Sequence, residues 1–121
     1  MPLGTFGPVT DPVITDSSLY RVVGENDLVR ILEYLDAPGD ATHIHAHPDS
    51  VMVALSAFKR VIISGGREVP VELDAGHVRW LDAQEHEGRN AGDTASHAIF
   101  IELKEPRPTP APQGSIGPST F

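Results

Sequence analysis

Three histidines stand at alternate positions in the segment GDATHIHAHPDSV, residues 39–51: His43, His45 and His47. On an extended strand, residues two apart point to the same side, so these three rings would share one face. Pro48 favours an extended conformation for His47, the residue before it. Neutral imidazole is the commonest transition-metal ligand, so the spacing predicts a metal or catalytic site. The alternative is a chance His-x-His on the surface.

A metal site needs a further ligand from elsewhere in the chain, and the remaining histidines are His77, His86 and His97. The chain has no cysteine, which excludes thiolate ligands. His86 lies in a polar segment where a strand would return to the same cavity. His77 follows Gly76 at the start of a strand, so we expect it in a turn or at a rim. His97 precedes an apolar run, and we expect it to be a hydrogen-bonded histidine at the cavity edge.

Short apolar runs separated by turn residues must position these histidines. Several runs alternate apolar and polar residues, which is the period of a half-buried strand. The separators, such as SGGR and NAGD, are typical of turns. The segment 51–60 is the one helix candidate, but its valines and the neighbouring pattern favour a strand. The sequence therefore predicts an all-β sandwich or barrel with strands near 19–23, 28–35, 51–55, 58–63, 68–73, 77–81 and 97–103.

Both ends of the chain differ from this central pattern. We expect residues 1–18 to form an extended N-terminal arm, residues 19–104 the barrel, and residues 105–121 a proline-rich C-terminal tail. The alternating prolines of the tail favour a polyproline II conformation, so we expect it to be mobile or laid along a surface.

Composition narrows the classes of partner. The formal net charge of the 121 residues is −8, and the 9 lysines and arginines are not clustered, so we expect no binding to nucleic acid. The chain contains no long apolar run and no secretion signal at its start, so we expect no membrane association and a cytoplasmic location. A small molecule is the expected partner.

The histidine spacing resembles that of the cupin family. Gly39 followed after five residues by His45 and His47 is similar to the first cupin motif. Gly76, with His86 and Asn90 in HEGRN, is similar to the second. The resemblance covers about residues 20–104 and implies a cupin-type jelly-roll β-barrel, also called a double-stranded β-helix.

The resemblance also implies a ligand set. His45, His47 and His86 would hold a divalent transition metal, which the chain does not identify as Fe, Mn, Zn, Ni or Cu. The glutamate of the first motif is absent, because positions 51 and 52 hold Val51 and Met52. His43, on the same predicted face, is the candidate for an additional ligand or a proton shuttle. We expect the remaining residues around the pocket to be Asn90, His97, Met52 and Trp80.

Three functions remain open on these residues. The first is a metal-dependent enzyme, of the dioxygenase or the isomerase and lyase type, acting on a small oxygenated organic molecule. The second is a metal-free dehydratase or lyase that uses a histidine as general base. The third is a non-catalytic module that binds a small ligand. Because cupins commonly pair through their sheets, we also expect a homodimer.

Overall fold

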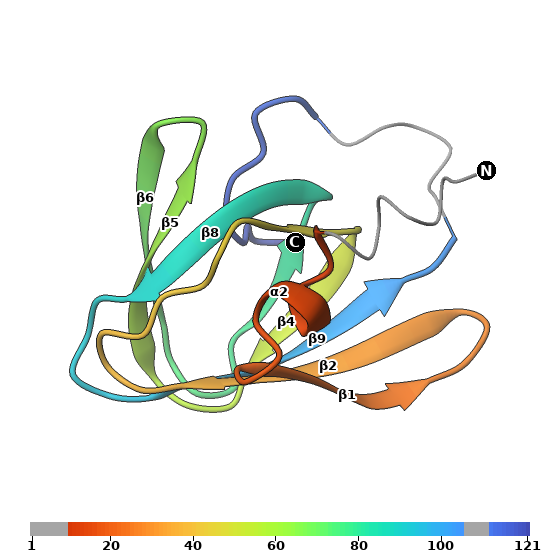
Figure 1. Ribbon diagram of the computed structural model, residues 1–121, viewed down its shortest axis with the longest axis horizontal. Coiled ribbons are helices and arrows are strands. Elements are labelled where there is room, and N and C mark those ends of the chain that lie inside the picture. Colours follow the sequence, from red (N-terminus) through yellow and green to blue (C-terminus); the bar gives the residue numbers. More distant parts are fainter. Residues whose placement is uncertain (1–9, 106–111) are drawn as a thin grey trace.

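The computed structural model describes residues 10–105 and 112–121. Within these two ranges, nine antiparallel strands form two sheets that face each other (Figure 1). The strands are β1 (Tyr20–Glu25), β2 (Val29–Asp36), β3 (His45–His47), β4 (Ser50–Ala54), β5 (Phe58–Ser64), β6 (Arg67–Leu73), β7 (Val78–Leu81), β8 (Gln84–Asn90) and β9 (Ser96–Leu103). The predicted all-β class and double-stranded β-helix architecture are confirmed.

The strands that are neighbours in each sheet are mostly not neighbours in the sequence. One sheet has five strands in the order β1-β2-β9-β4-β7, and the other has four in the order β3-β8-β5-β6. Sequence neighbours such as β3 and β4 therefore lie in different sheets, so the chain crosses repeatedly from one sheet to the other. Strand β8 lies between β3 and β5, and this position brings the segment of His86 beside the segment of His45 and His47.

Alternation of side chains along each strand separates the interior from the surface. In β9, every second residue from Ser96 to Glu102 is buried, and the residues between them are half-buried. The interior is apolar in its middle, where Leu32, Phe58, Leu81 and Phe100 belong to one core cluster. Polar side chains are buried on either side of this core, at Asp36 and Ser96 and again at Glu102. Glu102 lies six residues from Ser96 along β9, about 20 Å at the rise of a strand.

The described part of the N-terminal arm corrects one expectation. Residues 12–15 form a short helix, α2 (Pro12–Thr15), where we expected an extended segment. Asp11 caps it by accepting a hydrogen bond from the backbone amide of Val13 (3.0 Å), and Pro12 begins the turn with a favourable backbone angle. The first nine residues of the predicted arm lie outside the described residues.

At the other end of the chain, residues 112–121 return to the barrel. Ser119 forms an isolated bridge with Trp80 of β7. The predicted tail is therefore laid along the surface in this part, and residues 106–111 lie outside the described residues. No helix in the described ranges has the length and apolar character needed to cross a lipid bilayer.

Candidate metal centre

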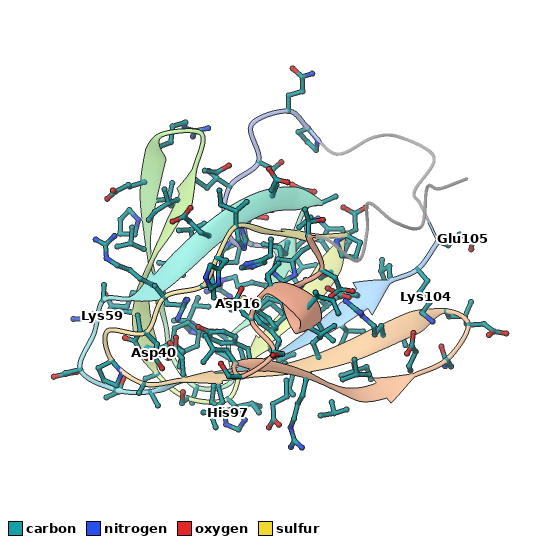
Figure 2. The ribbon with its side chains drawn as sticks, viewed as in Figure 1. Asp16, Asp40, Lys59, His97, Lys104 and Glu105 are labelled. Atoms are coloured by element: carbon teal, nitrogen blue, oxygen red, sulfur yellow. The ribbon has the colours of Figure 1, made fainter. Side chains whose placement is uncertain are left out.

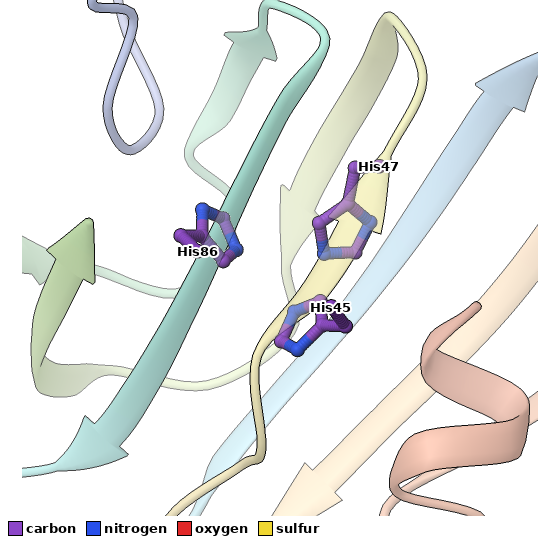
Figure 3. Close-up of side chains that lie close together, drawn as sticks. All are labelled: His45, His47 and His86. Atoms are coloured by element: carbon purple, nitrogen blue, oxygen red, sulfur yellow. The ribbon is translucent and has the colours of Figure 1, made fainter. Parts of the chain in front are cut away.

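Strands β3 and β8 bring three imidazole rings together inside the barrel. His45 lies directly opposite His86 in the strand register, and His47 is two residues further along β3 on the same face. One ring nitrogen of each lies within 4.8 Å of the other two, and Figure 3 shows the rings turned toward one another. Two nitrogen ligands of one metal ion, each about 2.1 Å from it, lie no more than about 4.2 Å apart, so the spacing of the rings is close to that of ligands on a shared ion. We name these three residues the histidine centre.

Each ring of the histidine centre has its Nδ1 next to an oxygen acceptor. His45 Nδ1 lies 2.8 Å from the carbonyl oxygen of His43. His47 Nδ1 lies 3.3 Å from Oε2 of Glu102, and His86 Nδ1 lies 2.7 Å from Oε1 of Gln84. A carbonyl or carboxylate oxygen can only accept, so each Nδ1 carries the proton and donates it. Each Nε2 is then left with a free lone pair.

The Nε2 atoms of His45 and His47 are buried and have no hydrogen-bond partner among the described residues. Leaving a buried polar atom unpaired costs about 1–3 kcal/mol, and such atoms are few in native proteins. In metal sites, a histidine bonded to the metal donates its other ring nitrogen to a carboxylate or carbonyl oxygen, which fixes the ring. The histidine centre has this arrangement at all three rings, so its donor set fits a divalent transition metal.

The rings are neutral in this environment. Burial lowers the pKa of His45 from its usual value, although the His43 carbonyl and Asp16 oppose the shift. Burial, followed by the neighbouring rings, holds the pKa of His47 well below its usual value and that of His86 at about 2. Neutral imidazole is the form that binds metals, so the site is in its ligand form at neutral pH.

A chain of charged groups supports His47 from outside the ring cluster. Glu102 is 4% exposed and is paired with Arg30, whose Nη2 lies 2.8 Å from Glu102 Oε1. Arg30 also contacts Asp11, the cap of α2, at 2.7 Å. Burial raises the pKa of Glu102, and Arg30 opposes this shift. The charge of Arg30 is thus shared by two carboxylates, one at the helix cap and one beside His47.

A small internal cavity opens beside two of the rings. It has about 30 Å³ of space for water-sized ligands, and its walls include His45 and His86 together with Tyr20, Met52 and Arg60. A water molecule needs about 10–15 Å³ by this measure, so the cavity holds about two. Met52, which we expected around the pocket, is one of the residues of this wall and is 6% exposed.

His43 does not share the face of the other two histidines, which corrects our expectation for an additional ligand or shuttle. Strand β3 begins at His45, so the two-residue alternation does not extend back to His43. The His43 side chain is 80% exposed and its Nδ1 lies 3.0 Å from Oδ1 of Asp16. Its contribution to the centre is its backbone carbonyl, which holds His45.

His97 and Trp80 also lie away from the cavity walls. His97 is on the outer face of β9, where its Nε2 lies 2.7 Å from Oε2 of Glu33; Figure 2 labels it at the outer side of the sheet. Trp80 packs edge-to-face with Phe121 and donates its indole N–H to Asp82. His77 is at a turn, as expected, where its Nδ1 accepts a hydrogen bond from the backbone amide of Asp74.

Asn90 is buried at the far end of β8 from His86. Its side-chain amide donates to Asp36 Oδ1 at 2.9 Å and to the carbonyl of Thr94. It belongs to a second buried polar group, which we name the ionic cluster and which consists of Tyr34, Asp36, Arg60, Asn90 and Ser96.

Sequence reasoning missed the residues that hold the rings. Glu102, which holds His47, and Arg60, which lines the cavity, stand at inward positions of the apolar runs HAIFIEL and FKRVII, and a charge at such a position is a signal that could have found them. Gln84 stands two residues before His86 on β8, so its side chain points to the same face. The sequence gives no comparable signal for it, because the whole strand is polar.

We compared the chain with known protein families, curated proteins and solved structures. No family model and no curated protein matches the sequence. Among solved structures, the chain is similar to a cupin domain from Bordetella pertussis Tohama I, with a TM-score of 0.67 and 26% identity over 72% of this chain and 93% of that one.

Two further structures have lower identity and support the fold alone. A protein with a double-stranded β-helix domain from Klebsiella pneumoniae matches with a TM-score of 0.56 and 18% identity, over 85% of this chain and 84% of that one. A predicted oxalate decarboxylase from Thermotoga maritima matches with a TM-score of 0.51 and 20% identity, over 69% of this chain and 78% of that one.

Proposed function

We propose that this chain, a single-domain cupin by its fold, is a metal-dependent enzyme that acts on a small oxygenated organic molecule at the histidine centre. The observation that carries the proposal is the pair of buried Nε2 atoms without a hydrogen-bond partner among the described residues, on His45 and His47. All three rings are held through Nδ1, and one ring nitrogen of each lies within 4.8 Å of the other two.

The chain's own residues would divide the work at such a site. His45, His47 and His86 would hold the ion and, being neutral, would leave its positive charge uncompensated. A bound divalent metal supplies Lewis-acid or redox chemistry to an oxygen-containing ligand. Arg60 lines the same cavity and is held by Asp36 and Ser96, so its positive charge would attract the negative end of a polar ligand. The small cavity volume favours a ligand of a few non-hydrogen atoms and limits the access of water.

The lowered pKa values bear on the metal-free alternative. A general base works best when its pKa is near the operating pH. His86, with a pKa of about 2, and His47, with a pKa well below its usual value, are weak bases. This favours the metal-dependent reading of the same three rings over a metal-free dehydratase or lyase.

The test is a metal titration of protein that has been purified without an affinity tag and stripped with chelator. Calorimetry with Mn²⁺, Fe²⁺, Ni²⁺, Cu²⁺ and Zn²⁺ should give one saturable site per chain for at least one ion. His86→Ala should weaken that binding at least 100-fold, because it removes one of three ligands. His77→Ala is the matched control, since it removes an imidazole from a turn, and it should bind as the wild type does.

Two outcomes would contradict the proposal. One is the absence of a saturable site for every ion, and the other is unchanged affinity in His86→Ala. If the metal binds but no small oxygenated acid, alcohol or ketone is turned over, the enzyme part fails and the chain is a metal-containing binding module.

The predicted homodimer is a separate proposal. Val22 and Val23, on the edge strand β1, are 43% and 47% exposed, and an exposed edge with apolar side chains can pair with a second copy. Light scattering at micromolar concentration should give twice the chain mass, and a monomer would contradict the proposal. The cytoplasmic location stays a prediction.

A further inference from the structure

The C-terminal segment, which we define as residues 112–121, lies against β6 and β7, the two strands that precede β8 in the chain. The backbones of Trp80 and Ser119 exchange two hydrogen bonds, with lengths of 2.9 and 2.7 Å. Gly114 accepts a hydrogen bond from Arg67 Nη1 at 3.2 Å, and Phe121 packs on Trp80 with ring centroids 6.2 Å apart. These contacts dock the segment on β6 and β7.

The segment also reaches the cavity of the histidine centre. Gly117 is buried, and Pro118 is one of the residues that line the cavity beside His45 and His86. Part of the wall around the proposed metal site is therefore supplied by a segment that lies outside the nine strands.

One side chain connects this segment to a histidine of the centre. The Oε1 atom of Gln84 lies 2.6 Å from the backbone nitrogen of Gly117 and 2.7 Å from Nδ1 of His86. A backbone N–H can only donate, so the atom that faces both groups is the amide oxygen, and His86 Nδ1 must donate to it as well. The amide nitrogen of Gln84 donates to the carbonyls of Asp82 (2.9 Å) and Gly117 (3.4 Å). The Gln84 side chain is thus fixed by contacts on both sides.

We propose that Gln84 is a positioning residue that couples docking of the C-terminal segment to the orientation of His86. When Gly117 is docked, Gln84 holds Nδ1 of His86 and the ring presents Nε2 to the ion. When the segment leaves, Gln84 loses two of its contacts and the cavity loses the wall at Pro118. The expected consequence is that docking of the segment raises metal affinity and slows metal release. This consequence rests on the proposed metal site.

Four full-length variants test the coupling. Gln84→Ala removes the acceptor of His86. Gln84→Glu keeps a side-chain oxygen for both donors. Gly117→Ala opposes docking without touching Gln84, because Gly117 has φ +71°, which disfavours alanine, while its added Cβ would meet only ordinary contacts of 3.6 and 3.8 Å. Gln113→Ala is the matched control, since Gln113 is the exposed glutamine of the same segment.

The readouts are the dissociation constant for the ion identified by titration, the rate of its release to a chelator, and the fluorescence of Trp80. Trp80 is the single tryptophan of the chain and touches the segment, so its emission reports docking. Gln84→Ala should weaken metal binding about 10–100-fold, as loss of a partner of a ligand histidine does elsewhere. Gln84→Glu should restore most of the affinity. Gly117→Ala should shift Trp80 emission and speed metal release, and Gln113→Ala should change neither.

The coupling is overturned if Gln84→Ala binds metal as the wild type does, or if Gly117→Ala shifts Trp80 emission without changing metal release. A wild type that binds no metal overturns the proposed function instead. In that case, nitrogen NMR of the imidazoles still decides the positioning role. The Nδ1–H tautomer of His86 in the wild type, lost in Gln84→Ala, supports it, and the same tautomer in both proteins overturns it.

Discussion

Two buried polar groups lie in the same barrel, and they differ in how completely their atoms are paired. Strand β8 supplies both, with His86 in the histidine centre and Asn90 in the ionic cluster. In the ionic cluster, Asp36 accepts hydrogen bonds from Tyr34, Arg60, Asn90 and the backbone of Ser96. In the histidine centre, two Nε2 atoms have no partner among the described residues.

The difference distinguishes groups that hold the fold from groups held ready for a ligand. A satisfied buried network stabilises one packing of the strands, whereas unpaired buried atoms lower stability and are kept where a ligand completes them. The charges agree with this division. Burial alone would raise the pKa of Asp36, but Tyr34, Asn90 and Arg60 hold it below its usual value. The rings carry no charge, and their pKa values are also lowered, by burial.

The largest effect is expected from the ionic cluster. Asp36→Asn leaves the guanidinium of Arg60 buried without its carboxylate, where the two side chains are 0% and 8% exposed. Breaking a buried pair in this way costs about 3–5 kcal/mol, so urea unfolding should show a loss of this size. Asp93→Asn, in an exposed loop, is the control and should change little. Equal losses in the two variants would contradict a structural role for the cluster.

A substitution in the histidine centre should lower the stability of the metal-free protein far less than Asp36→Asn does. His47→Leu removes an unpaired buried atom, and Glu102 keeps its partner Arg30, so the free energy of unfolding without metal should fall by less than about 1 kcal/mol or rise. In the wild type, metal at 100 times its dissociation constant should add about 2.7 kcal/mol, and in the variant this gain should vanish. Urea unfolding with and without metal measures both quantities. A large loss in the metal-free variant would make His47 a structural residue.

The same contrast explains what the sequence could and could not predict. His45 and His47 follow from local alternation, and His86 follows from the spacing of a family motif that fixes which strands meet. The same alternation wrongly predicted that His43 shares the face of His45 and His47, because β3 begins only at His45. The partners that hold the rings come from across the barrel. The contact of Glu102 with His47 joins residues 55 apart, and its position depends on the register between β4 and β9, which local periodicity does not determine.

A smaller effect is expected in the pH dependence of the unfolding free energy, which tests the charge of Asp36 in the ionic cluster. Because the folded-state pKa of Asp36 is lowered, its contribution to stability is complete above the unfolded value of about 3.9 and is lost as the pH falls through the folded value. The side-chain amide that Asp36→Asn introduces does not titrate. The difference in unfolding free energy between wild type and Asp36→Asn should therefore be constant above about pH 5 and narrow below about pH 4. A difference that stays constant down to about pH 3 would show that Asp36 is not the titrating partner of Arg60.

The smallest effect is expected at a third polar group, on the outer face of the five-stranded sheet. There, Glu33 contacts both His97, at 2.7 Å, and Arg21, at 2.6 Å. His97→Ala leaves Glu33 with Arg21, and pairs that are exposed to solvent contribute little to stability. The urea midpoint should therefore hardly move. Metal affinity should not move at all, because the His97 ring and the histidine centre lie on opposite faces of β9. A tenfold loss of metal affinity in His97→Ala would show that the outer ion pairs set the position of β9, and with it Glu102 and His47, so that the two faces of this strand do not act independently.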